Sequence, residues 1–173
     1  MNDLYISWSE YYQKIEVLAA KIYQSQWEFN QIICLARGGL RIGDILSRIY
    51  DVPLGILAAS SYGGPGGKIR GEIQIAHHLS MTTENLGDRI LLVDDLADSG
   101  ISLERSIIWL TEHYPDEIKK IRTGVIWYKS SSGFVPDYYV DFLSNNPWIH
   151  QPFEYYEQLQ PADLVHKVNG LDS

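Results

Sequence analysis

The feature that most limits how this chain can fold is an unbroken apolar run, Ile90–Val93, with two aspartates directly after it. A run without polar alternation is typical of a strand covered on both faces, as in a parallel sheet. In open parallel sheets, ligands bind beyond the carboxyl ends of the strands. We therefore expect Asp94 and Asp95 to stand at the end of a buried strand, beside a ligand site.

The following residues, Asp98–Ser102, are predicted to form a loop that runs into a helix. Backbone N–H groups point outward at a helix N-terminus, and the helix dipole favours an anion there. Gly100 allows the backbone to approach a ligand closely, while Ser99 and Ser102 offer hydroxyl donors. This segment is therefore a candidate phosphate-binding loop.

Three acids beside a phosphate, Asp94, Asp95 and Asp98, would repel it unless they face another group. Carboxylates accept hydrogen bonds from sugar hydroxyls and can coordinate Mg²⁺. A ligand that combines a phosphate, a diol and a metal is a sugar phosphate. The alternative is that the first two acids only end a strand and that Asp98 caps the helix.

Elsewhere the apolar periodicity predicts strands that alternate with helices, which indicates an α/β domain with a mainly parallel sheet flanked by helices. Ser7 and Glu10 have the spacing of a capping box before the first helix. The predicted helices cover residues 8–23, 42–49 and 102–114, with a further candidate from Pro161. The predicted strands cover residues 31–35, 52–62, 72–79, 90–93, 121–128 and 138–142.

The length of 173 residues fits one domain, and an apolar content of 45% is globular. The net charge of -8 argues against a nucleic-acid surface, which favours clustered Lys and Arg. A lone cysteine, Cys34, fits a reducing compartment. Neither a signal segment nor an apolar run of about 20 residues is found, so we expect a cytoplasmic protein without a membrane span.

The segment from residue 90 to 102 resembles the 5-phosphoribosyl-1-pyrophosphate (PRPP) signature of type I phosphoribosyltransferases. Ser99 and Ser102 stand where Thr is common, and Ile101 stands where Gly or Thr is frequent. The resemblance implies that Asp94, Asp95 and the loop from Asp98 to Ser102 bind the ribose and its 5-phosphate. It also implies Mg²⁺ near Asp94 and Asp95, held directly or through PRPP and water.

A second loop, ARGGL at residues 36–40, follows the strand predicted at 31–35. In the family this loop binds pyrophosphate through backbone N–H groups and a basic side chain, so the resemblance implies these roles for Gly38 and Arg37. A guanidinium suits bidentate contact with phosphate. The family often has a non-proline cis peptide here, for which Ala36–Arg37 is the candidate. The alternative is an ordinary strand-to-helix turn with a surface Arg.

The glycine-rich segment at residues 61–71 is not a P-loop, because Ile69 follows its lysine and Pro65 interrupts it. Its position resembles that of the mobile lid of these enzymes. By this resemblance, Lys68 and Arg70 close over pyrophosphate and exclude water. The alternative is a flexible hairpin tip whose charges are solvated.

Base specificity is expected further along the chain, where Lys129 directly follows a predicted strand and WIHQPFEYY begins at Trp148. The bacterial xanthine–guanine phosphoribosyltransferases are similar here. The resemblance implies that Lys129 donates to O6 of a 6-oxopurine, that Trp148 stacks on the ring, and that the backbone of Ile149 contacts the base edge. An ammonium donor suits a carbonyl oxygen and would clash with the amino group of adenine.

Alternatives remain for these positions, because Lys129 alone could be a solvent-exposed lysine and Trp148 a packing residue. His150 departs from the close relatives, in which an acidic residue is usual. The order of preference among hypoxanthine, guanine and xanthine is therefore open.

Taken together, the resemblance implies an Mg²⁺-dependent purine salvage enzyme that joins N9 of a 6-oxopurine to PRPP and releases pyrophosphate, with Asp98 as general acid/base. It implies one domain over residues 1–173, with a core of about 25–145 and a small hood from about 1–8 and 145–173. A homo-oligomer, dimer or tetramer, is expected. The alternatives are an enzyme for another base and a non-catalytic PRPP-sensing regulator.

Overall fold

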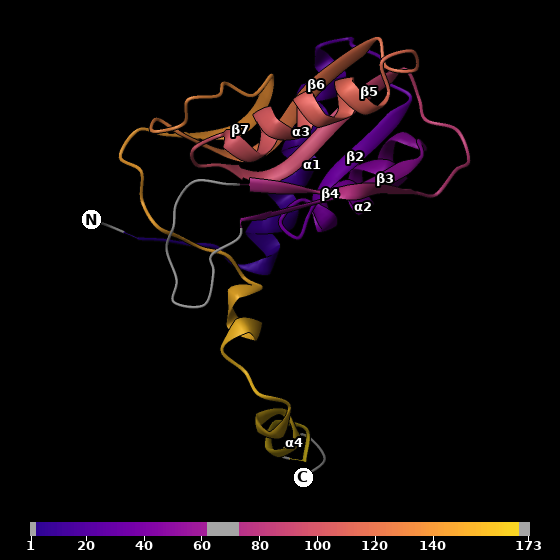
Figure 1. Cartoon of the computed structure of the whole chain (residues 1–173). Helices are drawn as coiled ribbons and strands as arrows, with labels where there is room; N and C mark the ends of the chain where they lie inside the picture. Colours follow the sequence, from indigo (N-terminus) through magenta and orange to yellow (C-terminus); the bar gives the residue numbers. More distant parts are fainter. Residues whose placement is uncertain (1–2, 62–72, 170–173) are drawn as a thin grey trace. The chain divides into compact units, whose positions relative to one another are not determined.

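The computed structural model describes residues 3–61 and 73–169 (Figure 1). Its internal contacts divide the chain into two compact units, residues 14–146 and residues 1–13 with 147–173. The two basic residues expected in the lid, Lys68 and Arg70, lie outside the described residues.

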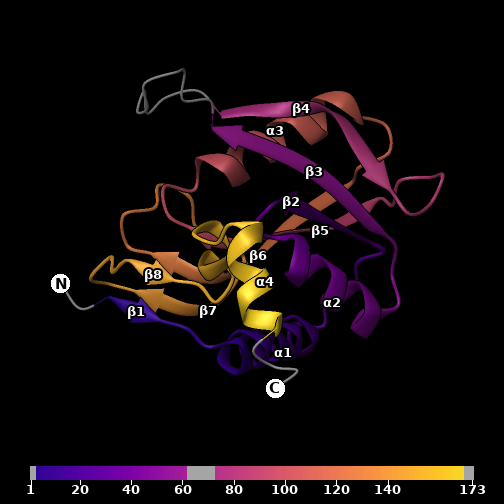
Figure 2. The same cartoon turned by 90° about the horizontal axis from the view of Figure 1, so that it is seen from below.

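The larger unit contains a six-stranded sheet in the order β4-β3-β2-β5-β6-β7. All neighbouring strands are parallel except β3 and β4, which are antiparallel. Figure 2 shows α2 on one face of this sheet and α3 on the other. This architecture confirms the expected α/β fold with a mainly parallel sheet. The bounds are β2 Gln31–Ala36, α2 Leu40–Tyr50, β3 Leu54–Ser61, β4 Ile73–Met81, β5 Arg89–Ala97, α3 Ile101–His113, β6 Lys120–Lys129 and β7 Tyr138–Leu143.

The centre of the sheet is apolar on both faces, as the uninterrupted apolar runs predict. Residues 32–35 of β2 and 90–93 of β5 are all buried, as is the middle of β6. Cys34 belongs to this core, and burial raises the pKa of its thiol to about 12. The two central strands are therefore held rigidly over these residues, and this fixes where their ends emerge.

One boundary differs from the prediction. Strand β5 does not end at Val93 but continues to Ala97, so Asp94 and Asp95 lie within it. The reason is one-sided pairing: β5 leaves β2 after Val93 but remains paired with β6 as far as Ala97. Because the chain turns to opposite sides of the sheet after β2 and β5, the fork between them is the topological switch point where ligands bind in such sheets.

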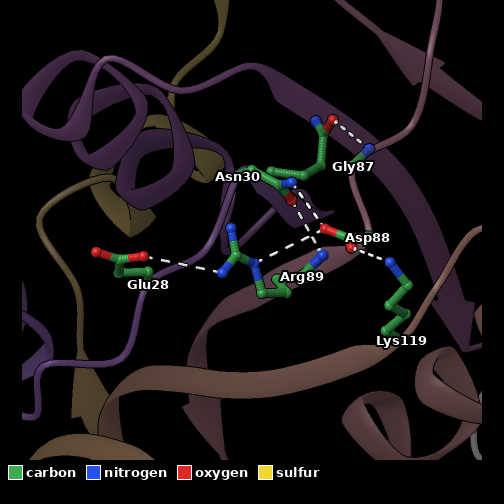
Figure 3. Close-up of polar contacts among 7 residues, drawn as sticks. Glu28, Asn30, Gly87, Asp88, Arg89 and Lys119 are labelled. Atoms are coloured by element: carbon green, nitrogen blue, oxygen red, sulfur yellow. Dashed lines mark hydrogen bonds and ion pairs between the residues drawn. The ribbon is translucent and has the colours of Figure 1, made fainter.

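At the opposite end of β5, a polar cluster ties three strands together (Figure 3). The Asp88 carboxylate accepts hydrogen bonds from Asn30 Nδ2 and Lys119 Nζ, both at 2.8 Å. These two bonds hold the pKa of Asp88 below its usual value. Arg89 lies within ion-pair distance of Glu28, at 3.8 Å. The cluster fixes the starts of β2, β5 and β6 relative to one another.

The smaller unit joins the two ends of the chain. Strand β1 (Leu4–Tyr5) pairs in parallel with β8 (Ile149–His150) and leads into α1 (Trp8–Gln24), whose second half belongs to the larger unit. The predicted capping box is confirmed, since Ser7 N–H donates to Glu10 Oε2 at 2.8 Å and Glu10 N–H donates to Ser7 Oγ at 3.2 Å. After β8 come the short helix η1 (Glu154–Glu157) and α4 (Pro161–Asn169), the helix expected from Pro161.

Among the residues that the structure describes, no helix combines the length and the apolar character needed to span a bilayer.

Candidate active site

The loop that follows β2 occupies the apex of the fork between β2 and β5. A Cβ atom on Gly39 would lie 2.5 Å from the carbonyl oxygen of Val93 and 2.9 Å from that of Leu35, so only glycine fits there. A Cβ on Gly38 would lie 2.6 Å from Cγ of Asp95. The ARGGL loop and the acidic end of β5 are therefore in direct contact, as expected for two halves of one site.

The peptide bond between Ala36 and Arg37 is cis, as the family resemblance anticipated. The loop then closes into α2, with Gly39 N–H donating to Leu35 O at 2.8 Å and Leu40 N–H donating to Arg37 O at 3.2 Å. Arg37 is exposed on this loop. Its role as a contact for pyrophosphate stays a prediction.

The two acids of β5 have different surroundings. Burial raises the pKa of Asp94 well above its usual value, and the neighbouring charge of Asp95 raises it further. Hydrogen bonds from the backbone of Asp95 and Gly39 oppose these effects in part. A buried carboxylate beside a second acid forms a site that gains from hydroxyl donors or from a cation.

The candidate phosphate loop has the geometry expected from its glycine. Gly100 is the N-cap of α3 and has φ of 79°, a conformation that other residues rarely adopt. The first N–H of α3, that of Ile101, donates to Ser99 Oγ at 3.4 Å, while the Asp98 side chain pairs with Lys129, so the alternative that Asp98 caps the helix is wrong. The helix begins at Ile101, and its N-terminus faces the loop.

A third segment supports the phosphate loop and was not predicted. In the loop between β6 and β7, Gly133 N–H donates to Ser99 O at 3.0 Å, and Ser131 Oγ donates to Asp98 O at 3.3 Å. A Cβ on Gly100 would overlap Phe134 and lie 2.6 Å from Ser132 Oγ. The run of three serines and a glycine after β6 could have indicated this segment, because loops that follow the strands of a sheet often carry functional residues.

Lys129 is the last residue of β6 rather than the first residue after it. It is only 6% exposed, so the interpretation of a solvated lysine is wrong. Its Nζ lies 3.3 Å from Oδ1 of Asp98, whose side chain is 63% exposed. The structure thus brings a buried ammonium group to the carboxylate that starts the phosphate loop.

Trp148 and Ile149 belong to the smaller unit, apart from the other predicted site residues. The Trp148 side chain is 63% exposed, which is the opposite of a packing residue in the core. Leu4 N–H donates to Trp148 O at 2.8 Å and Ile6 N–H donates to His150 O at 3.0 Å. By this parallel register, the N–H and C=O groups of Ile149 point away from β1, where a ligand edge could meet them.

Within residues 14–146, one region therefore combines a pair of acids, a glycine-rich loop that carries an exposed arginine, a helix N-terminus and a buried lysine. In the described part of the chain, no group of three or more His, Cys, Asp or Glu side chains could hold a metal ion. This arrangement is typical of a class of α/β proteins, those that bind an anionic, hydroxyl-bearing ligand at the switch point of the sheet.

Comparison with known families makes this class specific. The chain matches the model of the phosphoribosyl transferase domain over residues 7–158. It therefore belongs to the phosphoribosyltransferase family.

Relatives in sequence and structure agree with this assignment. The chain is 27% identical to the xanthine-guanine phosphoribosyltransferase of Idiomarina loihiensis, over 88% of each protein. Among solved structures, it resembles the purine phosphoribosyltransferase of Pyrococcus horikoshii with a TM-score of 0.67 and 29% identity, covering 88% of this chain and 94% of the other. The Helicobacter pylori xanthine-guanine-hypoxanthine phosphoribosyltransferase has the same fold, with a TM-score of 0.74 at 22% identity and coverage of 91% and 97%.

Proposed function

We propose that this phosphoribosyltransferase transfers the 5-phosphoribosyl group of PRPP to N9 of a 6-oxopurine, with release of pyrophosphate. The observation that carries the proposal is the buried Lys129 Nζ at 3.3 Å from Asp98. A fixed ammonium donor beside an accessible carboxylate matches a ring that presents a carbonyl acceptor next to a titrating nitrogen. The names of the relatives point to the same class of base.

In the proposed reaction, the bond from ribose C1 to pyrophosphate breaks and the bond from C1 to purine N9 forms. The ribose passes through a state with oxocarbenium character, as in glycosyl transfer generally. Asp94 and Asp95 accept hydrogen bonds from the ribose hydroxyls, and the loop from Asp98 to Ser102 binds the 5-phosphate. Asp98 accepts the proton at purine N7 while N9 attacks, which keeps the base neutral as the new bond forms.

The leaving group is held by the loop after β2. Arg37 and the backbone of Gly38 bind pyrophosphate, and Lys68 and Arg70 are proposed to join them. Mg²⁺, when bound, neutralises the pyrophosphate charge. The described residues fit an ion held through the pair Asp94 and Asp95 together with PRPP oxygens and water, because Mg²⁺ usually keeps several ligands that are not protein.

Three residues are proposed to recognise the base. Lys129 donates to O6, the exposed ring of Trp148 stacks on the purine, and the outward backbone groups of Ile149 contact its edge. In this proposal the hood, about residues 1–8 and 145–173, carries contacts to the base, while the core, about residues 25–145, carries the PRPP site.

The test is a pyrophosphate-release assay with PRPP, Mg²⁺ and a panel of bases: hypoxanthine, guanine, xanthine, adenine and a pyrimidine. Release with one or more 6-oxopurines and little with adenine supports the proposal. Release only with adenine or a pyrimidine would identify an enzyme for another base. Binding of PRPP by calorimetry without release from any base would indicate a regulator of the same fold.

A further inference from the structure

His150 occupies a closely packed polar and aromatic environment in the smaller unit. Its Nε2 lies 3.1 Å from Oδ2 of Asp3, where the carboxylate accepts a hydrogen bond. Its Nδ1 lies 3.6 Å from Oε2 of Glu154. The imidazole also stacks on Tyr5, with ring centroids 4.3 Å apart and an angle of 13° between the planes. The side chain therefore connects β8 to the segment before β1, to β1 and to η1.

His150 also contacts the side chain that is proposed to stack on the base. Side chains alternate along a strand, so Trp148 and His150 share one face of β8 and Ile149 points to the other. The rings of Trp148 and His150 have centroids 6.5 Å apart at 60°, an edge-to-face arrangement. Tyr5, His150 and Trp148 thus form a continuous row of rings.

These contacts occupy the polar atoms of the imidazole, while the side chain as a whole is 33% exposed. Both nitrogens face carboxylates and one face of the ring is covered by Tyr5. The imidazole is placed to orient its neighbours: its ring lies edge-to-face with that of Trp148, and its bond to Asp3 ties β8 to the segment before β1.

We propose that His150 is a positioning residue, which sets the ring of Trp148 and the backbone of Ile149 for base binding without touching the base. This inference rests on the proposed function. A third carboxylate between Asp3 and Glu154 would be repelled by both, so the residues around position 150 are matched to histidine in this chain.

The kinetic test compares the His150→Ala variant with the unmodified protein. The KM for the base is expected to rise roughly 5- to 20-fold, the worth of one aromatic contact and one hydrogen bond, while the KM for PRPP stays unchanged. His113→Ala is the matched control, because His113 also stacks on a tryptophan, Trp109, at 4.1 Å and 19°. It lies at the far end of α3 and should leave both constants unchanged.

Two further variants separate the contributions of the imidazole. His150→Gln keeps a donor for Asp3 without the ring, and His150→Phe keeps the ring without a donor. Each should recover part of the affinity for the base. An equal rise of both KM values in all three variants would indicate a general structural defect and overturn the proposal, as would no change in either constant.

A readout without turnover keeps this test separate from that of the proposed function. The indole N–H resonance of Trp148, assigned by its loss in W148F, should be a single sharp NMR signal that broadens or shifts in His150→Ala but not in His113→Ala. An unchanged signal would overturn the positioning role even if no base were a substrate. If the signal changes while no base reacts, the proposed function fails and the positioning role stands.

A further variant tests whether the carboxylates of Asp3 and Glu154 select the residue at position 150. His150→Glu should raise the KM for the base more than His150→Ala does. The triple change D3N/E154Q/H150E, which supplies amide donors on both sides, should restore most of the lost affinity. Failure of this rescue, with His150→Glu no worse than His150→Ala, would show that the two carboxylates do not select the residue at this position.

Discussion

Lys129 Nζ lies 3.3 Å from Asp98 Oδ1, and this ion pair joins the end of β6 to the first residue of the phosphate loop. The lysine is buried and the aspartate is exposed. Because of this difference in burial, the ammonium group is held in place while the carboxylate stays accessible to a ligand. A base that binds here meets a donor and an acceptor already set at a fixed separation, which is the preorganisation that proton transfer requires.

The first prediction concerns Asp98 as general acid/base. Asp98→Asn should lower turnover by about 10²- to 10⁴-fold, because an amide cannot accept the proton. PRPP binding, measured by calorimetry, should change little, since the loop backbone and its serines remain. A fully active Asn variant would remove Asp98 from this role.

Lys129→Met tests base recognition with a side chain of similar length and no charge. The KM for the base should rise about 10- to 100-fold, as expected for loss of a hydrogen bond from a charged donor, with a smaller effect on the KM for PRPP. Lys119→Met is the control: it also removes a lysine paired with an aspartate, Asp88 at 2.8 Å, but at the other end of the sheet. Equal changes in the two KM values of Lys129→Met would contradict the assignment.

A series of glycine-to-alanine variants tests how closely the loop after β2 packs against the apex of the fork. Gly39→Ala should destabilise the protein most, by about 1–3 kcal/mol, because its Cβ meets backbone carbonyl oxygens that cannot move aside. Gly38→Ala meets the Asp95 side chain, which can rotate, so activity should suffer more than stability. Gly124→Ala, whose nearest neighbours are 3.7 Å away, is the control. The order of the three variants by melting temperature should differ from their order by rate of pyrophosphate release. The same order in both measurements would argue against the fork as the site.

The raised pKa of Asp94 leads to a prediction about stability. The pKa of the Asp94 carboxyl is higher in the folded protein than in the unfolded chain. The carboxyl therefore contributes its full stabilisation at a pH below the pKa of the unfolded chain, and this contribution is lost as the pH rises through the folded pKa. At pH 7 its charge therefore opposes folding. Asp94→Asn should raise the melting temperature at pH 7, and the gain should shrink toward pH ~4, near the ordinary pKa of Asp.

The same variant should bind PRPP and Mg²⁺ more weakly, so the ligands should no longer raise its melting temperature as much as they raise that of the unmodified protein. Asp116→Asn, on an exposed surface, is the control for loss of one negative charge. A lower melting temperature for Asp94→Asn at pH 7 would show that its backbone hydrogen bonds outweigh the cost of burial.

Much of the fold could be predicted because the relevant signals are local. The apolar run Ile90–Val93 indicated a buried parallel strand, and the capping box of Ser7 and Glu10 located the start of α1. The phosphate loop before α3 was recognisable because its glycine, hydroxyls and acids are contiguous. These features depend on neighbours in sequence, which a pattern records directly.

What could not be predicted depends on contacts between distant segments. The extension of β5 to Ala97 results from pairing with β6, and the support of the phosphate loop comes from Ser131 and Gly133 in another loop. The burial of Lys129 likewise follows from its place at the end of an interior strand. A local sequence pattern cannot predict these three features, because each depends on contacts that form only when the sheet assembles.

The separation of β2 from β5 after Val93 has a consequence for self-association. Where two strands part, a length of strand edge is opened, and open edges on the outside of a sheet invite pairing with another chain. Here the opening lies in the middle of the sheet, with β3 and β6 on either side and Gly39 wedged at its apex. A strand of another chain therefore cannot pair there. The sheet thus has an opening at the proposed ligand site that does not act as a template for aggregation.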